Sequence, residues 1–221
     1  MKTGTLNIVN KSTLSRGLET IVENEKIKLN KEVLDSTLNA SEISNCLRSL
    51  AYKSIKPSKN NLSTEKHHNK FVIEKWCDLL KYYVKAKNIY LSDCNYNLVG
   101  NGDIILEIDY HHVLLKIQSV NNNDFKHILT KGAFKKDVLE LMINEWLVEV
   151  DEGLLVYENR DDLKFEIFQV YLFTQIIESV KSKCKNLMEC KIKGELPDRP
   201  YKKNNSKECK NCNYCEECWK S

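Results

Sequence analysis

Long apolar runs are absent from this sequence of 221 residues. A helix needs about 20 consecutive apolar residues to cross a bilayer, so we expect a protein that does not span a membrane. The opening residues, MKTGTLNIVNKS, lack the apolar stretch of a signal peptide. Both absences predict a cytoplasmic protein, located in the host cytoplasm if the gene is viral.

A strong charge imbalance is also absent, because 34 Lys and Arg stand against 31 Asp and Glu. The net charge of +3 permits nucleic-acid binding without requiring it. Glycine and proline are scarce, with seven and three residues, whereas Lys, Asn and Ile are abundant. This bias is typical of an AT-rich genome, and we expect the source to be a phage or a low-GC bacterium.

Apolar side chains recur at helical or alternating spacing along most of the chain. Helical spacing is found at residues 41–52, where Ser41 is a candidate N-cap, and at 70–87, 134–148 and 173–190. Alternating or buried strand patterns occupy residues 103–110, 113–120, 153–158 and 163–170. The first two of these strands predict a hairpin with a tight connection at His111–His112. This order predicts an α/β or α+β domain with a central mixed sheet flanked by helices.

The length suits one domain with an appendage, and no internal repeat is present. We expect an N-terminal arm or helix over residues 1–38, a core over 39–190 and a cysteine-rich segment over 191–221. The arm carries Leu14 and Leu18 at helical spacing, with Ile21 and Val22 following. This apolar stripe predicts either packing on the core or contact with a partner protein.

Cysteine is abundant, with nine residues, four of them among the last thirteen. Cys209, Cys212, Cys215 and Cys218 are each separated by two residues, a spacing that lets thiolates reach one metal centre. In a reducing compartment, clustered cysteines indicate metal more often than disulfides. Zinc and iron–sulfur clusters both accept four thiolates. Cys46, far away in the sequence, is a candidate additional ligand.

Residues 112–120, HVLLKIQSV, form a strand pattern with two polar side chains on one face. Lys116 and Gln118 alternate with Leu114 and Val120 on that face. A buried lysine is costly unless it is paired. The sequence therefore predicts a polar site next to this strand.

Four segments, taken in order, resemble the RecB-like nucleases of the PD-(D/E)XK superfamily. They are SEISNCLRSLAY, GNGDIILEIDYHHVLLKIQSV, LLVYENRDD and ELPDRPYKKNNSKECKNCNYCEECW. The most similar group is the CRISPR-associated iron–sulfur exonuclease and its phage relatives, and the resemblance covers about residues 39–221. It implies a 4Fe-4S cluster held by Cys46, Cys209, Cys212 and Cys218, which joins the two ends of the chain. Cys215 is an extra thiol and an alternative ligand, and zinc is the alternative metal.

The resemblance also implies a nuclease site with a divalent ion, Mg²⁺ or Mn²⁺, that polarises the phosphate and activates water. Asp103 matches the metal-binding aspartate. The next strand of the family carries a Glu and a Lys two residues apart, and here these positions are Lys116 and Gln118. An ammonium group in place of a carboxylate disfavours a divalent cation. We therefore expect Lys116 to pair with Asp103 in a degenerate nuclease site.

The helix predicted over residues 134–148 also departs from the family's sequence pattern. Glu140 and Asn144 stand where the family carries Gln and Tyr, and Asp137 stands where His is common. Spacings of three and four residues place these three side chains on one stripe of the helix. The family's early acidic or histidine ligand has three candidates, which are Glu74, His67 and His68.

The sequence is compatible with three functions. The first is a DNA-binding protein that no longer cleaves, contacting phosphates through the basic segments Lys53–Lys59 and Lys191–Lys203. The second is an active Mg²⁺- or Mn²⁺-dependent DNase in which Asp103 works with Glu140; Glu107 and Asp109 are weaker candidate helpers. The third is a protein-binding subunit of a phage replication or transcription assembly, acting through residues 1–38.

Overall fold

The computed structural model describes residues 37–55 and 64–220 of the chain. The N-terminal arm and most of the segment Lys53–Lys59 lie outside these residues. The described part contains a six-stranded mixed sheet in the order β1-β3-β4-β5-β6, with β2 paired to β3. The strands are β1 (Leu38–Asn39), β2 (Val84–Asp93), β3 (Leu98–Ile108), β4 (His111–Val120), β5 (Glu152–Asn159) and β6 (Phe165–Tyr171).

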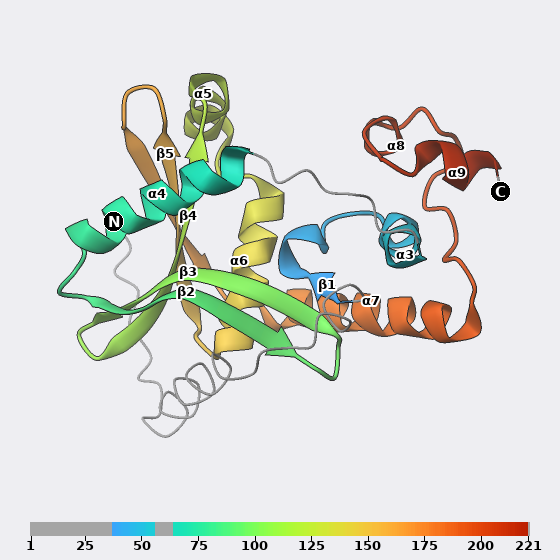
Figure 1. Cartoon of the computed structure of the whole chain (residues 1–221), viewed down its shortest axis with the longest axis horizontal. Coiled ribbons are helices and arrows are strands. Elements are labelled where there is room, and N and C mark those ends of the chain that lie inside the picture. Colours follow the sequence, from blue (N-terminus) through green and yellow to red (C-terminus); the bar gives the residue numbers. More distant parts are fainter. Residues whose placement is uncertain (1–36, 56–63, 221) are drawn as a thin grey trace.

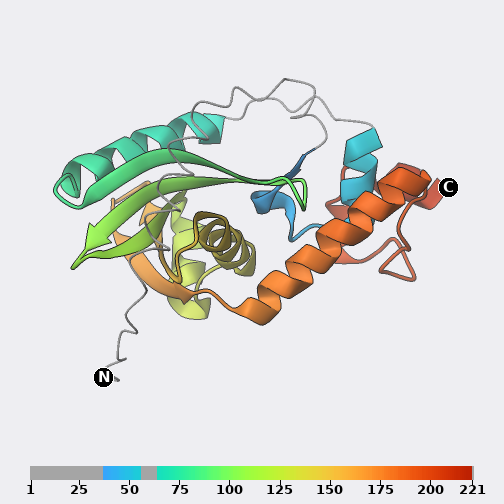
Figure 2. The same cartoon turned by 90° about the horizontal axis from the view of Figure 1, so that it is seen from below.

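Helices cover both faces of this sheet (Figures 1 and 2). One face is covered by α4 (Thr64–Leu79), and the other by α5 (Asn122–Lys131) and α6 (Lys135–Val148). The long α7 (Thr174–Lys193) runs from the sheet to α3 (Leu47–Ile55), which follows a short 3-10 turn at Ala40–Glu42. Two short helices, α8 (Lys207–Lys210) and α9 (Cys215–Lys220), lie near α3 at the C-terminal end. This agrees with the predicted mixed sheet flanked by helices.

Successive side chains along each strand point to opposite faces of the sheet, so the hydrophobic core forms one cluster on each face. Leu115 and Ile117 of β4 pack with Trp76 of α4 in one cluster. Leu114 of β4 packs with Leu141 of α6 in the other cluster. The side chain of Lys116 lies on the Leu114 face, because successive side chains of a strand point to opposite faces. The sheet therefore directs this lysine toward α6.

The structure confirms the hairpin, the helix over 134–148, the two later strands and the helix over 173–190, with small shifts at their ends. The predicted helix over 70–87 is wrong in its second half, because α4 ends at Leu79 and residues 84–93 form β2. In β2, Ile89 and Leu91 alternate with partly exposed residues and enter the core, which is strand spacing. The pairing of β2 with β3 along its whole length stabilises this strand.

Two predicted boundaries also need correction. The hairpin turns at Asp109–Tyr110, because His111 is already paired with Ile108 and His112 with Glu107. Ser41 is not the cap of α3, which begins at Leu47. Asn39 caps the preceding 3-10 turn, and its side-chain oxygen accepts a hydrogen bond from the Ser41 backbone N–H at 3.1 Å.

None of the described helices has both the length and the apolar character needed to cross a membrane.

Candidate functional site

The central polar site is built from β3, β4 and α6. Strand β4 runs parallel to β5, and α5 and α6 form the connection between them; α6 packs on the sheet beside the hairpin. Helix α6 has a stripe of polar side chains, which are Asp137, Glu140 and Asn144, among apolar neighbours. Each of the three forms a polar contact with a residue of the sheet. The stripe predicted from sequence spacing is therefore the surface that meets the polar face of the hairpin.

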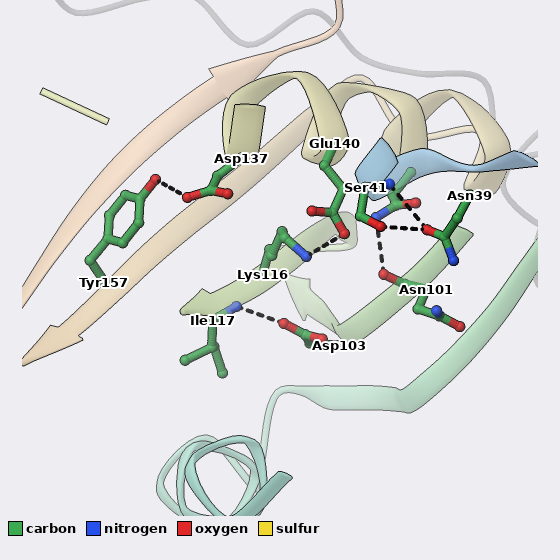
Figure 3. Close-up of polar contacts among 10 residues, drawn as sticks. Asn39, Ser41, Asn101, Asp103, Lys116, Ile117, Asp137, Glu140 and Tyr157 are labelled. Atoms are coloured by element: carbon green, nitrogen blue, oxygen red, sulfur yellow. Dashed lines mark hydrogen bonds and ion pairs between the residues drawn. The ribbon is translucent and has the colours of Figure 1, made fainter. Parts of the chain in front are cut away.

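Lys116 forms the centre of this site. Its ammonium Nζ donates to Glu140 Oε1 at 2.9 Å, and both side chains are largely withdrawn from solvent. Burial disfavours the charge on Lys116, but the carboxylates of Asp103 and Glu140 outweigh it and raise the pKa of Lys116. The lysine is thus held as a cation. Figure 3 shows it pointing to Glu140, with Asp103 on the adjacent strand.

Asp103 lies at the point where regular pairing between β3 and β4 ends. The paired register runs from Ile104 and Leu115 toward the turn, and Asp103 Oδ2 accepts the backbone N–H of Ile117 at 2.7 Å. Burial raises the pKa of the Asp103 carboxyl, although Lys116 and the Ile117 N–H act in the opposite direction. We expected Lys116 to pair with Asp103. The ion pair is instead with Glu140, and Asp103 interacts with Lys116 only through its charge.

The other two polar residues of this stripe, Asp137 and Asn144, are committed to structural contacts. Asp137 Oδ2 accepts the hydroxyl of the fully buried Tyr157 at 2.7 Å. That hydroxyl in turn accepts the Phe134 backbone N–H at 3.1 Å. Asn144 Nδ2 donates to the Asn101 carbonyl of β3 at 2.9 Å. Burial and the Asp137 carboxylate raise the pKa of Tyr157, so its hydroxyl stays protonated.

Several candidate residues take no part in the contacts that the structure describes among Asp103, Lys116 and Glu140. Glu74 is exposed on α4, and Gln118 is half-buried on β4. Glu107 pairs with Lys85 at 2.9 Å, and Asp109 lies in the hairpin turn. His67 and His68 belong to the first turns of α4, where side chains fall outside the described part. The structure thus brings together Asp103, Lys116 and Glu140.

Sequence reasoning missed Glu158, a buried acid on β5. Its Oε2 accepts the Trp76 indole N–H at 2.9 Å and pairs with Lys75, so it ties α4 to the sheet. The motif LLVYE carried the signal, since a charged residue ends an otherwise apolar buried strand. Its partners come from a helix about 80 positions earlier, and the spacing of residues along β5 does not reveal them.

The second polar feature is the contact between α3 and the C-terminal segment. The Tyr52 ring stacks on Tyr214 with centroids 5.9 Å apart. Arg48 donates to the Pro197 carbonyl at 2.7 Å, and the Tyr52 hydroxyl donates to the Glu217 carbonyl at 3.3 Å. The two ends of the described chain are therefore joined by side-chain contacts.

All five cysteines of the predicted metal site line one small cavity in this contact, of about 30 Å³. They are Cys46, Cys209, Cys212, Cys215 and Cys218. Burial and the neighbouring thiols raise the pKa of Cys215. In the described residues, no three Cys, His, Asp or Glu side chains are already arranged to hold a metal ion. The donor chemistry and the shared cavity fit a thiolate-bound group, and binding requires the thiols to draw closer together.

The sequence matches no family model and no curated protein. Solved structures do match. The alkaline exonuclease of Laribacter hongkongensis aligns with a TM-score of 0.58 and 9% identity, over 72% of this chain and 91% of that enzyme. The same enzyme in complex with dAMP aligns with a TM-score of 0.58 and 8% identity, over the same shares of the two chains.

A third solved structure, of the protein SSO0001, extends the match to almost the whole chain. It aligns with a TM-score of 0.57 and 14% identity, and covers 96% of both chains. At these identities the likeness concerns the fold alone. The chain therefore has the mixed α/β fold of the alkaline exonuclease, with Asp103, Lys116 and Glu140 gathered where β3, β4 and α6 meet.

Proposed function

We propose that this protein binds DNA with an exonuclease fold that has lost the ability to cleave. The observation that carries the proposal is the buried ion pair between Lys116 and Glu140, next to Asp103. In the RecB-like frame, Asp103 and the residue at position 116 would together hold a divalent ion. An ammonium group now occupies that position and neutralises the remaining acids.

Electrostatics supports the absence of a catalytic ion at this position. Two unit charges 4 Å apart interact by about 4 kcal/mol at an effective dielectric constant of 20. A divalent ion beside the Lys116 ammonium would meet repulsion of at least that order. It would also compete with the lysine for Glu140.

Phosphate binding is supported by an exposed basic stretch at the end of α7. Residues 191–203 contain five Lys and Arg against two Asp and Glu. Most of these side chains are exposed. Such a stretch releases counterions when it meets a nucleic-acid backbone, which gives salt-dependent affinity without sequence preference.

The proposal includes a 4Fe-4S cluster held by Cys46, Cys209, Cys212 and Cys218, with zinc as the alternative. Cys215 is the alternative ligand. When bound, the group would supply a covalent link between the two chain ends. The stacking of Tyr52 on Tyr214 already brings these ends together, so the metal would reinforce an existing contact.

The decisive experiment is a nuclease assay with labelled DNA in Mg²⁺ and in Mn²⁺. It compares the wild type with the double variant Lys116→Glu/Gln118→Lys, which restores the carboxylate and the lysine of the family. We expect the wild type to bind DNA without cutting it and the double variant to gain cleavage. Cutting by the wild type that Asp103→Ala abolishes would overturn the proposal.

That last outcome would favour the second candidate function, an active nuclease with relocated carboxylates. One observation supports it: Asp103 and Glu140 act on the same ammonium group, although they come from different elements. Two converging carboxylates are the ligands that Mg²⁺ and Mn²⁺ require. In that case Asp103→Ala and Glu140→Ala would each abolish cutting, whereas Glu107→Ala would not.

A further inference from the structure

Three exposed tyrosines gather at the end of the sheet remote from the cavity that the five cysteines line. Tyr82 and Tyr83 lie between α4 and β2, and Tyr110 lies in the turn between β3 and β4. Tyr82 and Tyr110 are each 86% exposed, and Tyr83 is 52% exposed. Both connections lie at the same end of the molecule in Figures 1 and 2. We call these three residues the tyrosine platform.

Hydrogen bonds fix the two connections against each other. The Glu107 backbone N–H donates to the Tyr83 carbonyl at 2.8 Å. The Glu107 carboxylate pairs with Lys85 at 2.9 Å and with His112 at 3.3 Å. The platform is therefore a fixed surface and not a set of independent loops.

The backbone at Tyr110 gives an independent reason to assign it a function. Asp109 and Tyr110 both have positive φ, at 50° and 66°, as a two-residue hairpin turn requires. Glycine is favoured at the second of these positions, because a side chain there is strained. A tyrosine that is both strained and 86% exposed adds nothing to the core. Its ring is available to a ligand.

Cations accompany the rings. Lys81 Nζ lies 5.0 Å from the Tyr82 ring centroid, and Lys87 is exposed farther along β2, opposite Ile104 and toward Asp103. Neither lysine forms an ion pair within the described residues, whereas Glu107 is neutralised by its two partners. Two exposed acids, Asp78 and Asp109, lie close in sequence to Tyr82 and Tyr110. Exposed rings that stack bases beside cations that bind phosphates are the combination found in proteins that bind single strands.

We infer that the tyrosine platform binds single-stranded DNA by stacking unpaired bases on Tyr82 and Tyr110, with Lys81 and Lys87 near the phosphates. Duplex DNA hides its base faces and cannot use the rings in this way. This inference rests on the proposed DNA-binding function and adds the class of DNA. Asp109 lies six positions after Asp103, which is roughly 20 Å along a strand. A bound strand of several nucleotides would span that distance.

The test measures the affinity of the full chain for fluorescein-labelled dT16 by anisotropy, with EDTA present so that no cleavage occurs. Tyr82→Ser and Tyr110→Gly should each weaken binding roughly tenfold, the usual effect of removing one stacked base. Tyr110→Gly should not lower the melting temperature, because glycine accepts the positive φ. Tyr171→Ser is the matched control, since Tyr171 is 51% exposed on β6 and should leave affinity unchanged.

A second probe separates stacking from charge. An oligonucleotide of the same length with abasic sites keeps the phosphates and removes the bases. Wild type should bind it at least tenfold more weakly than dT16, and the double variant Tyr82→Ser/Tyr110→Gly should not discriminate.

The outcomes distinguish this inference from the function on which it rests. If the wild type binds DNA but the platform variants bind it equally well, the platform is overturned while DNA binding stands. Equal affinity of the wild type for dT16 and for its abasic form would also overturn the platform. If the wild type binds no DNA, both proposals fall. If it cleaves DNA in Mg²⁺ and the platform variants still lose affinity, only the loss of cleavage is refuted.

Discussion

At the scale of single residues, one lysine sets the chemistry of the central site. The Lys116 ammonium is 2.9 Å from Glu140 and is held charged by two carboxylates. A buried pair of this kind is costly to break, because the partner that remains is left without compensation. In the function that we propose, the Lys116 side chain both stabilises the fold and takes the place of the divalent ion.

Lys116→Gln should lower the free energy of unfolding by roughly 3 kcal/mol, because it leaves Glu140 without its cation. Urea denaturation measures this change. The control is Lys181→Gln, whose partner Glu178 is 61% exposed and whose loss should cost less than about 1 kcal/mol.

The same variant reports on metal binding. With the ammonium removed, Asp103 and Glu140 should accept Mg²⁺ or Mn²⁺, so millimolar divalent ion should raise the melting temperature of Lys116→Gln and leave that of the wild type unchanged. Equal stabilisation of the two proteins would show that Lys116 does not take the place of the ion.

At the scale of elements, α6 supplies the polar and charged groups that face the sheet. Its polar stripe meets the hairpin and β5 through Glu140, Asn144 and Asp137. Its apolar residues pack in the core on both sides of this stripe. The contact between α6 and β5 also contains Glu145, a fully buried carboxyl that has no hydrogen-bond partner in the described residues. It lies against Gly153, where a Cβ would come within 2.3 Å of Glu145 Oε1.

Glu145 should make stability depend on pH. Burial, with the Asp151 and Glu152 carboxylates nearby, raises the pKa of Glu145 from 4.5 to about 8. Between these values the folded protein binds more protons than the unfolded chain, so stability falls as pH rises from about 4.5 to 8. The loss is up to about 1.4 kcal/mol per pH unit. Chemical denaturation across this pH range should show a weaker decline for Glu145→Gln than for wild type.

Glu189→Gln, on the exposed side of α7, is the matched control and should retain the wild-type dependence on pH. Parallel pH profiles for wild type and Glu145→Gln would mean that Glu145 is hydrated or paired in solution.

At the scale of the whole molecule, the chain closes on itself through the contact between α3 and the C-terminal segment. Arg48 and Tyr52 of α3 form this contact with the Pro197 carbonyl and the Tyr214 ring of the other end. The five cysteines line its cavity. A metal bound there would hold together segments more than 160 positions apart, and long closed loops are those in which a cross-link is most effective.

Anaerobically purified protein should be brown, with broad absorbance near about 400 nm from a thiolate-bound cluster. Cys46→Ser should lose the colour and the iron, and its C-terminal segment should become sensitive to protease. Cys94→Ser, at an exposed cysteine far from the cavity in sequence, should behave as wild type. Colourless protein that contains one equivalent of zinc would show that the site holds zinc and not a cluster. Wild-type protein without any bound metal would contradict both alternatives.

The sequence by itself determined most of the elements and the composition of both sites. Alternation of side chains is a local property, so β3, β4 and β5 and the polar stripe of α6 follow from spacing alone. The resemblance directed attention to position 116 and to the cysteines. The helix predicted over 70–87 failed at Leu79 because short apolar patterns fit a helix and a strand alike, and only pairing with β3 decides for β2.

Tertiary structure alone decided which groups meet. Asp103, Lys116 and Glu140 come from three elements, and whether the lysine pairs with the strand or with the helix depends on how α6 crosses the sheet. The two tyrosine-bearing connections, 26 positions apart at Tyr83 and Asp109, become neighbours only when β2 pairs with β3. Charge and hydrogen bonding act over a few ångströms, and only the folded chain sets such distances between residues that are remote in sequence.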